Sequence, residues 1–179
     1  MAVVAIVGIL AALATFGIRK YLAASKSAEA KDQVGAIARS AVAAYSRQQS
    51  SPDAVVLGVH TGDEHQLCTT STWVPDSIDK VKGTKYQPNT AEGQDFNTGS
   101  QTDGWKCLRF SIDHPISYQF NYSNGVGDWS GTFAGAYFVA RGQGDLDGDA
   151  TFARFLRGGR VENGSVTLST ALWLQNETE

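Results

Sequence analysis

The first eighteen residues carry no charged side chain, and this run constrains the chain more than any other feature. As a helix, a run of this length extends about 27 Å, close to the ~30 Å hydrocarbon core of a bilayer. A cleaved signal peptide would have a basic segment before a shorter apolar run, and a cleavage site after it. A buried core helix is seldom apolar on every side in a domain of this size. We therefore expect residues 1–18 to enter a membrane or a core of packed helices.

The helical pattern continues from Arg19 to about Gln49, just before Pro52. Apolar residues in this stretch recur at spacings of three and four, which is typical of an amphipathic helix. These residues are Ala24, Val34, Ile37, Ala38, Ala41, Val42 and Tyr45. We predict one helix over residues 1–50, about 75 Å long. Its half 1–18 is apolar all round, and its half 19–50 lies on a globular head formed by residues 51–179.

Charge divides the chain in the same place. Residues 1–50 contain six Lys and Arg against two Asp and Glu, a balance of +4, while the rest holds nine against sixteen, a balance of −7. A head that binds nucleic acid would be basic, so we expect no nucleic-acid partner. A basic arm joined to an acidic head can also attract a neighbouring copy.

The stretch MAVVAIVGILAALA, from Met1 to Ala14, closely resembles the N-terminal helix of type IV pilins and type II secretion pseudopilins. Tyr21 and the segment LAASKSAEAKDQV (22–34) continue the likeness, which extends over residues 1–45. Family helices usually begin with a Phe-Thr-Leu-Ile-Glu-Leu segment behind a short basic leader, and they commonly carry a proline where this chain has Phe16. We expect the natural N-terminus to carry that segment and the positive charges of the leader.

This resemblance implies the structural subunit of a type IV pilus-like filament in a bacterium. The apolar helix would be held in the inner membrane, and the pilus assembly machinery would then move it into the core of a cell-surface filament of identical subunits. The helix residues implied for the membrane and the filament core are Val4, Ile6, Gly8, Leu10, Leu13 and Phe16. The alternatives are a type II secretion pseudopilin, a minor pilin, or a membrane-anchored binding domain with a concave polar site.

The head shows strand patterns only in its C-terminal part. Residues 50–104 are rich in Thr, Ser, Asp, Gln and Gly and predict a long excursion with little regular structure. Four segments beyond them have strand patterns separated by turn residues, including Gly158–Gly164, and these segments are 116–122, 132–141, 151–156 and 165–174. We predict an α+β fold, pilin-like in layout, with the long helix packed on an antiparallel sheet of about four strands.

Cys68 and Cys107 are the only cysteines, and they bracket much of the irregular region. A zinc site would need further ligands at suitable spacing, which the three histidines do not supply. A pair of free buried thiols is the alternative to a disulfide. An exported head favours the disulfide.

Asp145, Asp147 and Asp149 alternate as in the first half of a calcium loop. Ala150 and Leu156 stand where an EF-hand has its glycine and its bidentate glutamate, so a complete EF-hand is excluded. Two interpretations stay open: a shallower calcium site completed by loop carbonyls, and a hairpin turn in which aspartates supply local hydrogen bonds. No other cofactor is indicated.

Signals for catalysis are weak. Asp113 and His114 precede a proline, and the sequence contains neither a Gly-x-Ser-x-Gly elbow nor a Cys/His nucleophile setting. The glycine pairs do not form a phosphate-binding loop, and the four tryptophans are better explained as core or interface residues. We therefore expect a protein that is not an enzyme.

Overall fold

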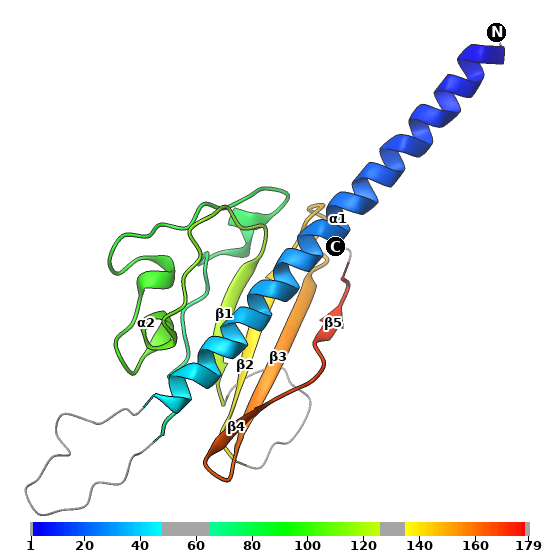
Figure 1. Cartoon of the computed structure of the whole chain (residues 1–179). Helices are drawn as coiled ribbons and strands as arrows, with labels where there is room; N and C mark the ends of the chain where they lie inside the picture. Colours follow the sequence, from blue (N-terminus) through cyan, green and yellow to red (C-terminus); the bar gives the residue numbers. More distant parts are fainter. Residues whose placement is uncertain (1, 48–64, 126–134, 178–179) are drawn as a thin grey trace, which may run out of the picture.

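The computed structural model describes residues 2–47, 65–125 and 135–177, without the side chains of Phe16 and Arg19. It contains a long N-terminal helix and an antiparallel sheet, which confirms the predicted α+β fold. The elements are α1 (Ala2–Ser46), η2 (Ile78–Val81), η3 (Asp95–Asn97), α2 (Gly104–Leu108), β1 (Gln119–Asn124), β2 (Tyr137–Gly144), β3 (Ala153–Glu162), β4 (Ser165–Leu168) and β5 (Trp173–Gln175). Figure 1 shows α1 projecting far beyond the head at its N-terminal end and running along the strands at its other end.

The C-terminal half of α1 packs on the sheet through the stripe predicted from its spacing. Ala30, Val34, Ile37, Ala38 and Ala41 are each at most 1% exposed. Most of these side chains are small, so the helix backbone approaches the strands closely. The spacing also places Ala24 on the stripe, but Ala24 is exposed, because the helix has already left the head at that point.

The sheet follows the order β1-β2-β3-β4 with antiparallel pairs throughout, and β5 also pairs with β3. Its helix-facing side presents large aromatic rings that α1 covers, namely those of Tyr118, Phe120, Tyr122, Phe138 and Phe155. Gly142 faces Phe120 across the ladder, and a Cβ there would lie 3.0 Å from Val34 on the helix. Glycine at this position therefore leaves room for Val34 of α1 to pack against β2.

The turn predicted at Gly158–Gly164 is wrong at its beginning. Gly158 and Gly159 lie inside β3. A Cβ on Gly159 would lie 2.6 Å from the ring of Phe138, so this glycine makes room for a core aromatic in the middle of a strand. The turn follows later, at Asn163 and Gly164, whose φ angles of 51° and 74° suit a two-residue hairpin connection.

The last predicted strand, 165–174, is divided in two. β4 pairs with the C-terminal part of β3, and β5 pairs with its N-terminal part, so both lie on the same edge.

The predicted strands 116–122 and 132–141 correspond to β1 and β2, although residues 132–134 lie outside the described residues. The helical pattern predicts an end near Gln49. The helix ends at Ser46, and residues 48–50 are not among those described.

The segment between the helix and the sheet is held by pairing and by a disulfide. Val74 exchanges two backbone hydrogen bonds with Phe120, at 2.9 and 2.8 Å, and Tyr86 does the same with Ile116. η2, η3 and α2 are the short helices in the described part of this region. The excursion is thus irregular, as predicted, but packed against the edge of β1.

Candidate functional sites

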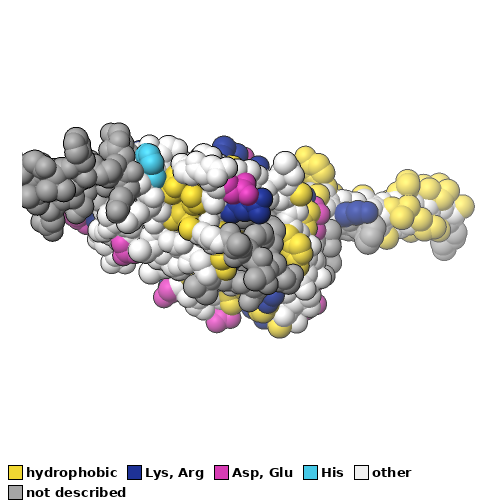
Figure 2. All heavy atoms as spheres, turned by 90° about the horizontal axis from the view of Figure 1, so that it is seen from below, with side chains coloured by type: hydrophobic (Ala, Val, Ile, Leu, Met, Phe, Trp, Pro, Cys, Tyr) yellow, Lys and Arg dark blue, Asp and Glu magenta, His cyan; other side chains and the backbone are white. Residues whose placement is uncertain are grey.

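The N-terminal half of α1 is exposed along its whole described length. Ten large apolar side chains between Val3 and Leu22 are more than half exposed, with Val4 at 74% and Leu10 at 59%. Figure 2 shows this segment as a mostly apolar rod leaving the head. A Cβ added at Gly8 would have no neighbour within 4 Å, so no other described part of a single copy contacts the helix there. The residues Val4, Ile6, Gly8, Leu10 and Leu13 therefore form one free apolar surface, while the side chain of Phe16 lies outside the described part.

By its length and composition, α1 can cross a membrane. The apolar part of α1 that is long enough to span a membrane is not buried within the protein, whereas the core helix of a soluble domain is mostly buried. A signal sequence near an N-terminus can also meet these requirements of length and apolar composition. In either case, the apolar half of α1 needs a partner other than its own head.

The structure brings the three aspartates of the β2–β3 connection together. Oxygen atoms of Asp145, Asp147 and Asp149 lie within 4.8 Å of one another. Asp145 is 1% exposed, and the other two are at the surface. The carboxylate of Asp145 accepts hydrogen bonds from the backbone N–H groups of Gly148 (2.6 Å) and Ala150 (3.0 Å).

Lys82 supplies a positive charge to the same carboxylate. Its Nζ lies 3.4 Å from Oδ2 of Asp145. Burial by itself would raise the pKa of Asp145, but the two backbone N–H donors and Lys82 outweigh it and hold the pKa below its usual value. Asp147 and Asp149 each accept one N–H two residues ahead, from Asp149 and Thr151. These contacts support the hydrogen-bonded turn, and calcium at this turn stays a prediction.

Cys68 and Cys107 form a disulfide, with their Cα atoms 5.8 Å apart. Cys107 lies on α2, and its carbonyl accepts a hydrogen bond from the guanidinium of Arg47 at the end of α1. The disulfide closes a long loop by joining Cys68 to α2, and the hydrogen bond from Arg47 connects α2 to the end of α1. Such a disulfide typically stabilises a fold by about 2–4 kcal/mol.

One contact between the C-terminal segment and α1 has no signal in the sequence. Glu177, two residues beyond β5, forms an ion pair with Lys31 and accepts a hydrogen bond from the hydroxyl of Ser27 at 3.2 Å. The hydrogen bond from Lys31 is the main reason why the pKa of Glu177 is lowered. The C-terminal segment is thereby fastened to α1 near the point where the helix leaves the head.

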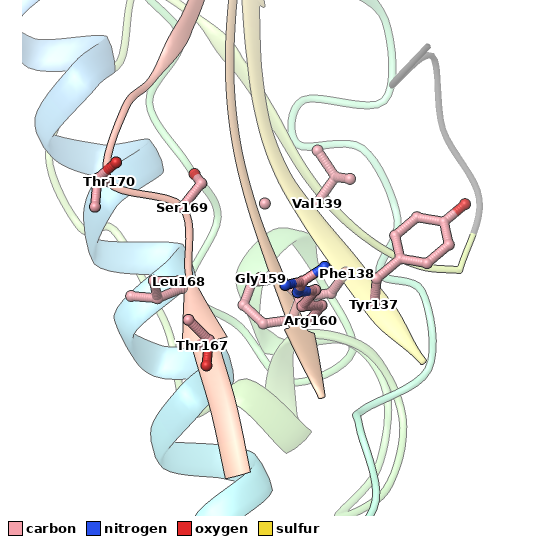
Figure 3. Close-up of a pocket in the computed structure, with 10 residues that line it drawn as sticks. Tyr137, Phe138, Val139, Gly159, Arg160, Thr167, Leu168, Ser169 and Thr170 are labelled. Carbon is pink, nitrogen blue, oxygen red and sulfur yellow. The ribbon is translucent and has the colours of Figure 1, made fainter. Parts of the chain in front are cut away.

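The cavity in Figure 3 has a volume of about 280 Å³ and lies between the ends of β2, β3 and β4. Tyr137 and Val139 line it from β2, and Thr167 and Ser169 line it from β4 and the residue that follows. Arg160 is the charged residue of its described lining, and its guanidinium lies 2.5 Å from a carboxylate oxygen of Glu162. A paired arginine among hydroxyl and aliphatic groups provides no acid–base or nucleophilic arrangement in the described lining.

No protein-family model matches the chain, and searches of curated proteins and of solved structures found no match either.

Proposed function

We propose that this chain is the structural subunit of a type IV pilus-like helical filament. The observation that supports this is the continuous helix α1, which is exposed and apolar in one half and packed on the head in the other. Burying a large apolar side chain stabilises by roughly 1.5–3 kcal/mol, so ten exposed ones make the isolated, water-exposed helix strongly unfavourable. The membrane removes these apolar side chains from water before assembly, and the helices of neighbouring subunits do so in the filament.

The composition of the exposed half suits helix packing. Ala and Gly are interspersed among Val, Ile and Leu from Ala2 to Gly17, and small residues let helix backbones approach closely. Copies added in one direction would make a contact that does not close on itself, which produces a filament rather than a ring. The sequence resemblance to pilin helices agrees with this proposal.

A type II secretion pseudopilin or a minor pilin would use the same helix in the same way. A membrane-anchored binding domain is the different proposal. It is favoured by a ligand-sized pocket of about 440 Å³ on the head, lined by Asn89, Lys106 and Arg109 among others, and it requires the chain to stay monomeric in the membrane.

The test is a charge in the middle of the exposed half. We expect Leu10→Asp to abolish filaments, because an unpaired carboxylate cannot enter a helix-packed or lipid environment without a large cost. Sheared cell surfaces are examined by negative-stain electron microscopy, and near-UV circular dichroism checks that the head is folded. Leu10→Met is the matched control and should retain filaments. Normal filaments from Leu10→Asp would refute assembly through a buried helix, and a wild-type chain that remains monomeric would favour the anchored domain.

A further inference from the structure

A second pocket lies on the side of the head formed by η3, α2 and the segment after α2. Figure 1 shows α2 on the opposite side of the molecule from β5. The pocket has a volume of about 440 Å³, within the range of small-molecule sites. Three buried aromatic residues in mutual contact, with ring centroids 4.9–5.7 Å apart, are part of its lining: Phe96, Trp105 and Phe110.

Two cations line this pocket, and one of them has no counter-charge among the described residues. The Nζ atom of Lys106 lies 3.4 Å from Oε1 of the exposed Glu92. The guanidinium of Arg109 has neither an ion pair nor a hydrogen bond within the described part of the chain. Arg47 is close enough for the charge of Arg109 to contribute to lowering the pKa of Arg47, after the larger effect of burial. Positive charge is therefore concentrated beside the pocket of a head that is acidic overall.

The backbone at Arg109 is in an unusual conformation. Its φ and ψ are 53° and 41°, the left-handed region that a residue with a Cβ seldom adopts. Its N–H donates to the carbonyl of Lys106 at 3.2 Å and so ends α2. Glycine or asparagine normally occupies this position at the end of a helix. Arg109 therefore places a long cationic side chain beside the pocket at the cost of an unfavourable backbone conformation.

Neutral hydrogen-bonding groups complete the lining. The carbonyl oxygen of Asn89 accepts from Ala91, which leaves its NH₂ group without a partner among the described residues. The hydroxyl groups of Thr90 and Ser111 and the side-chain carbonyl of Asn97 also have no hydrogen-bond partner in that part of the protein. The pocket thus offers mainly donors, one cation without a described partner and three aromatic residues.

We propose that this pocket binds an acidic saccharide, with the carboxylate at Arg109 and Lys106 and the ring hydroxyls at the amide and hydroxyl groups. Arginine binds carboxylates through two parallel N–H donors. A pocket of about 440 Å³ exceeds the size of an inorganic anion, and its hydroxyl and amide groups match a polyhydroxylated ring. This site is independent of filament assembly, since it lies on the head and uses no residue of the exposed half of α1.

The experiment is calorimetric titration of the full-length chain in detergent micelles with D-glucuronate. We expect saturable binding, and Arg109→Asn should raise the Kd about tenfold, since loss of a carboxylate contact worth ~1.4 kcal/mol corresponds to that factor. Asparagine tolerates the left-handed backbone, so this variant removes the charge without adding strain. Arg39→Gln, which removes an arginine from the exposed face of α1, should bind glucuronate as the wild type does.

Two further ligands separate the sources of affinity. D-Glucose tests the hydroxyl contacts alone, and inorganic phosphate tests the charge alone; both should bind much more weakly than glucuronate. Equal binding of glucose, full displacement by phosphate at equal concentration, or an unchanged Kd in Arg109→Asn would each overturn the proposal. A Leu10→Asp chain that forms no filaments should still bind glucuronate, which keeps this test separate from the test of assembly.

Discussion

The hydroxyl groups of Tyr122 and Tyr86 differ in whether they have a hydrogen-bond partner among the described residues. Tyr122 is fully buried on β1, and its hydroxyl has no hydrogen-bond partner among the described residues, so burial raises its pKa. The hydroxyl of Tyr86 donates to Asp95 at 2.7 Å. Burial, and then this carboxylate, raise the pKa of Tyr86 to about 12. A buried polar group without a partner costs stability, whereas one with a partner contributes to it.

We therefore expect Tyr122→Phe to raise the free energy of unfolding by about 1 kcal/mol and Tyr86→Phe to lower it by about the same amount. Urea unfolding followed by tryptophan fluorescence measures both. The two variants remove one identical atom, so each is the control for the other. A loss of stability in Tyr122→Phe equal to that in Tyr86→Phe would mean that the buried hydroxyl has a partner.

The roles of some single residues could be predicted from the sequence, and those of others could not. The stripe of small and branched residues on α1 was predictable, because helical spacing alone decides which side chains face the head. Gly159 looks like part of a turn because glycine usually marks one. Its actual role depends on the ring of Phe138 in the neighbouring strand, and no local pattern contains that information.

Among the elements, the β2–β3 connection depends most clearly on charge. Asp145 organises this turn through two backbone N–H groups and Lys82. Its pKa in the folded chain lies below that of an unfolded aspartate, near 3.9. The carboxylate therefore stabilises the fold above that pH, and this contribution is lost as the pH falls through and below it.

We expect Asp145→Asn to be less stable than the wild type at pH 7 and to lose less further stability on acidification. Urea unfolding at a series of pH values between about 7 and 2, in the presence of a chelator, gives the two slopes. Asp147→Asn is the control, because Asp147 is exposed and accepts one backbone N–H at 3.2 Å. An unchanged slope in Asp145→Asn would show that another carboxylate controls the acid sensitivity.

The long helix followed by an antiparallel sheet was predictable, but the short helices η2, η3 and α2 and the ends of the strands were not. The strand patterns located β1, β2 and the first part of β3, but they missed the C-terminal part of β3 and the division between β4 and β5. Both strands pair with β3, but the register shifts by two residues between them, so residues 169–172 interrupt the edge while β3 continues. The disulfide was predictable from an argument about export, and its link to α1 through Arg47 was not.

At the scale of the whole molecule, the six cations of the basic arm do not all remain available to a neighbouring copy. Lys31 is engaged by Glu177 of its own head. Arg39 has an exposed guanidinium, 4.0 Å from an equally exposed Asp32. An exposed pair contributes at most about 1 kcal/mol, so Arg39 can exchange this partner for a carboxylate on another subunit.

We expect Arg39→Glu to weaken filaments more at low than at high ionic strength, because salt screens contacts between exposed charges. Filament yield after shearing at several salt concentrations measures this. Lys31→Glu should differ from it by lowering the stability of the head itself, through repulsion of Glu177. An Arg39→Glu filament with wild-type yield at every salt concentration would exclude this residue from subunit contacts.

The acidic-sugar pocket could not be predicted from sequence at any scale. Its lining comes from residues 89–97 and 105–112, which look like parts of an undistinguished polar loop. The ring contacts of Phe96 with Trp105 and Phe110 join these two segments, and Arg109 becomes notable only through its backbone angles.

The direction of α1 relative to the strands has a mechanical consequence. A force that acts between the exposed half of α1 and its own head would pull the helix along its axis relative to the sheet. Because the helix lies along the strands, such a pull slides it over the sheet and loads the contacts of Val34, Ile37 and Ala41 simultaneously. A load shared in shear must break all of these contacts at once, so forced unfolding meets a high barrier and a correspondingly slow rate.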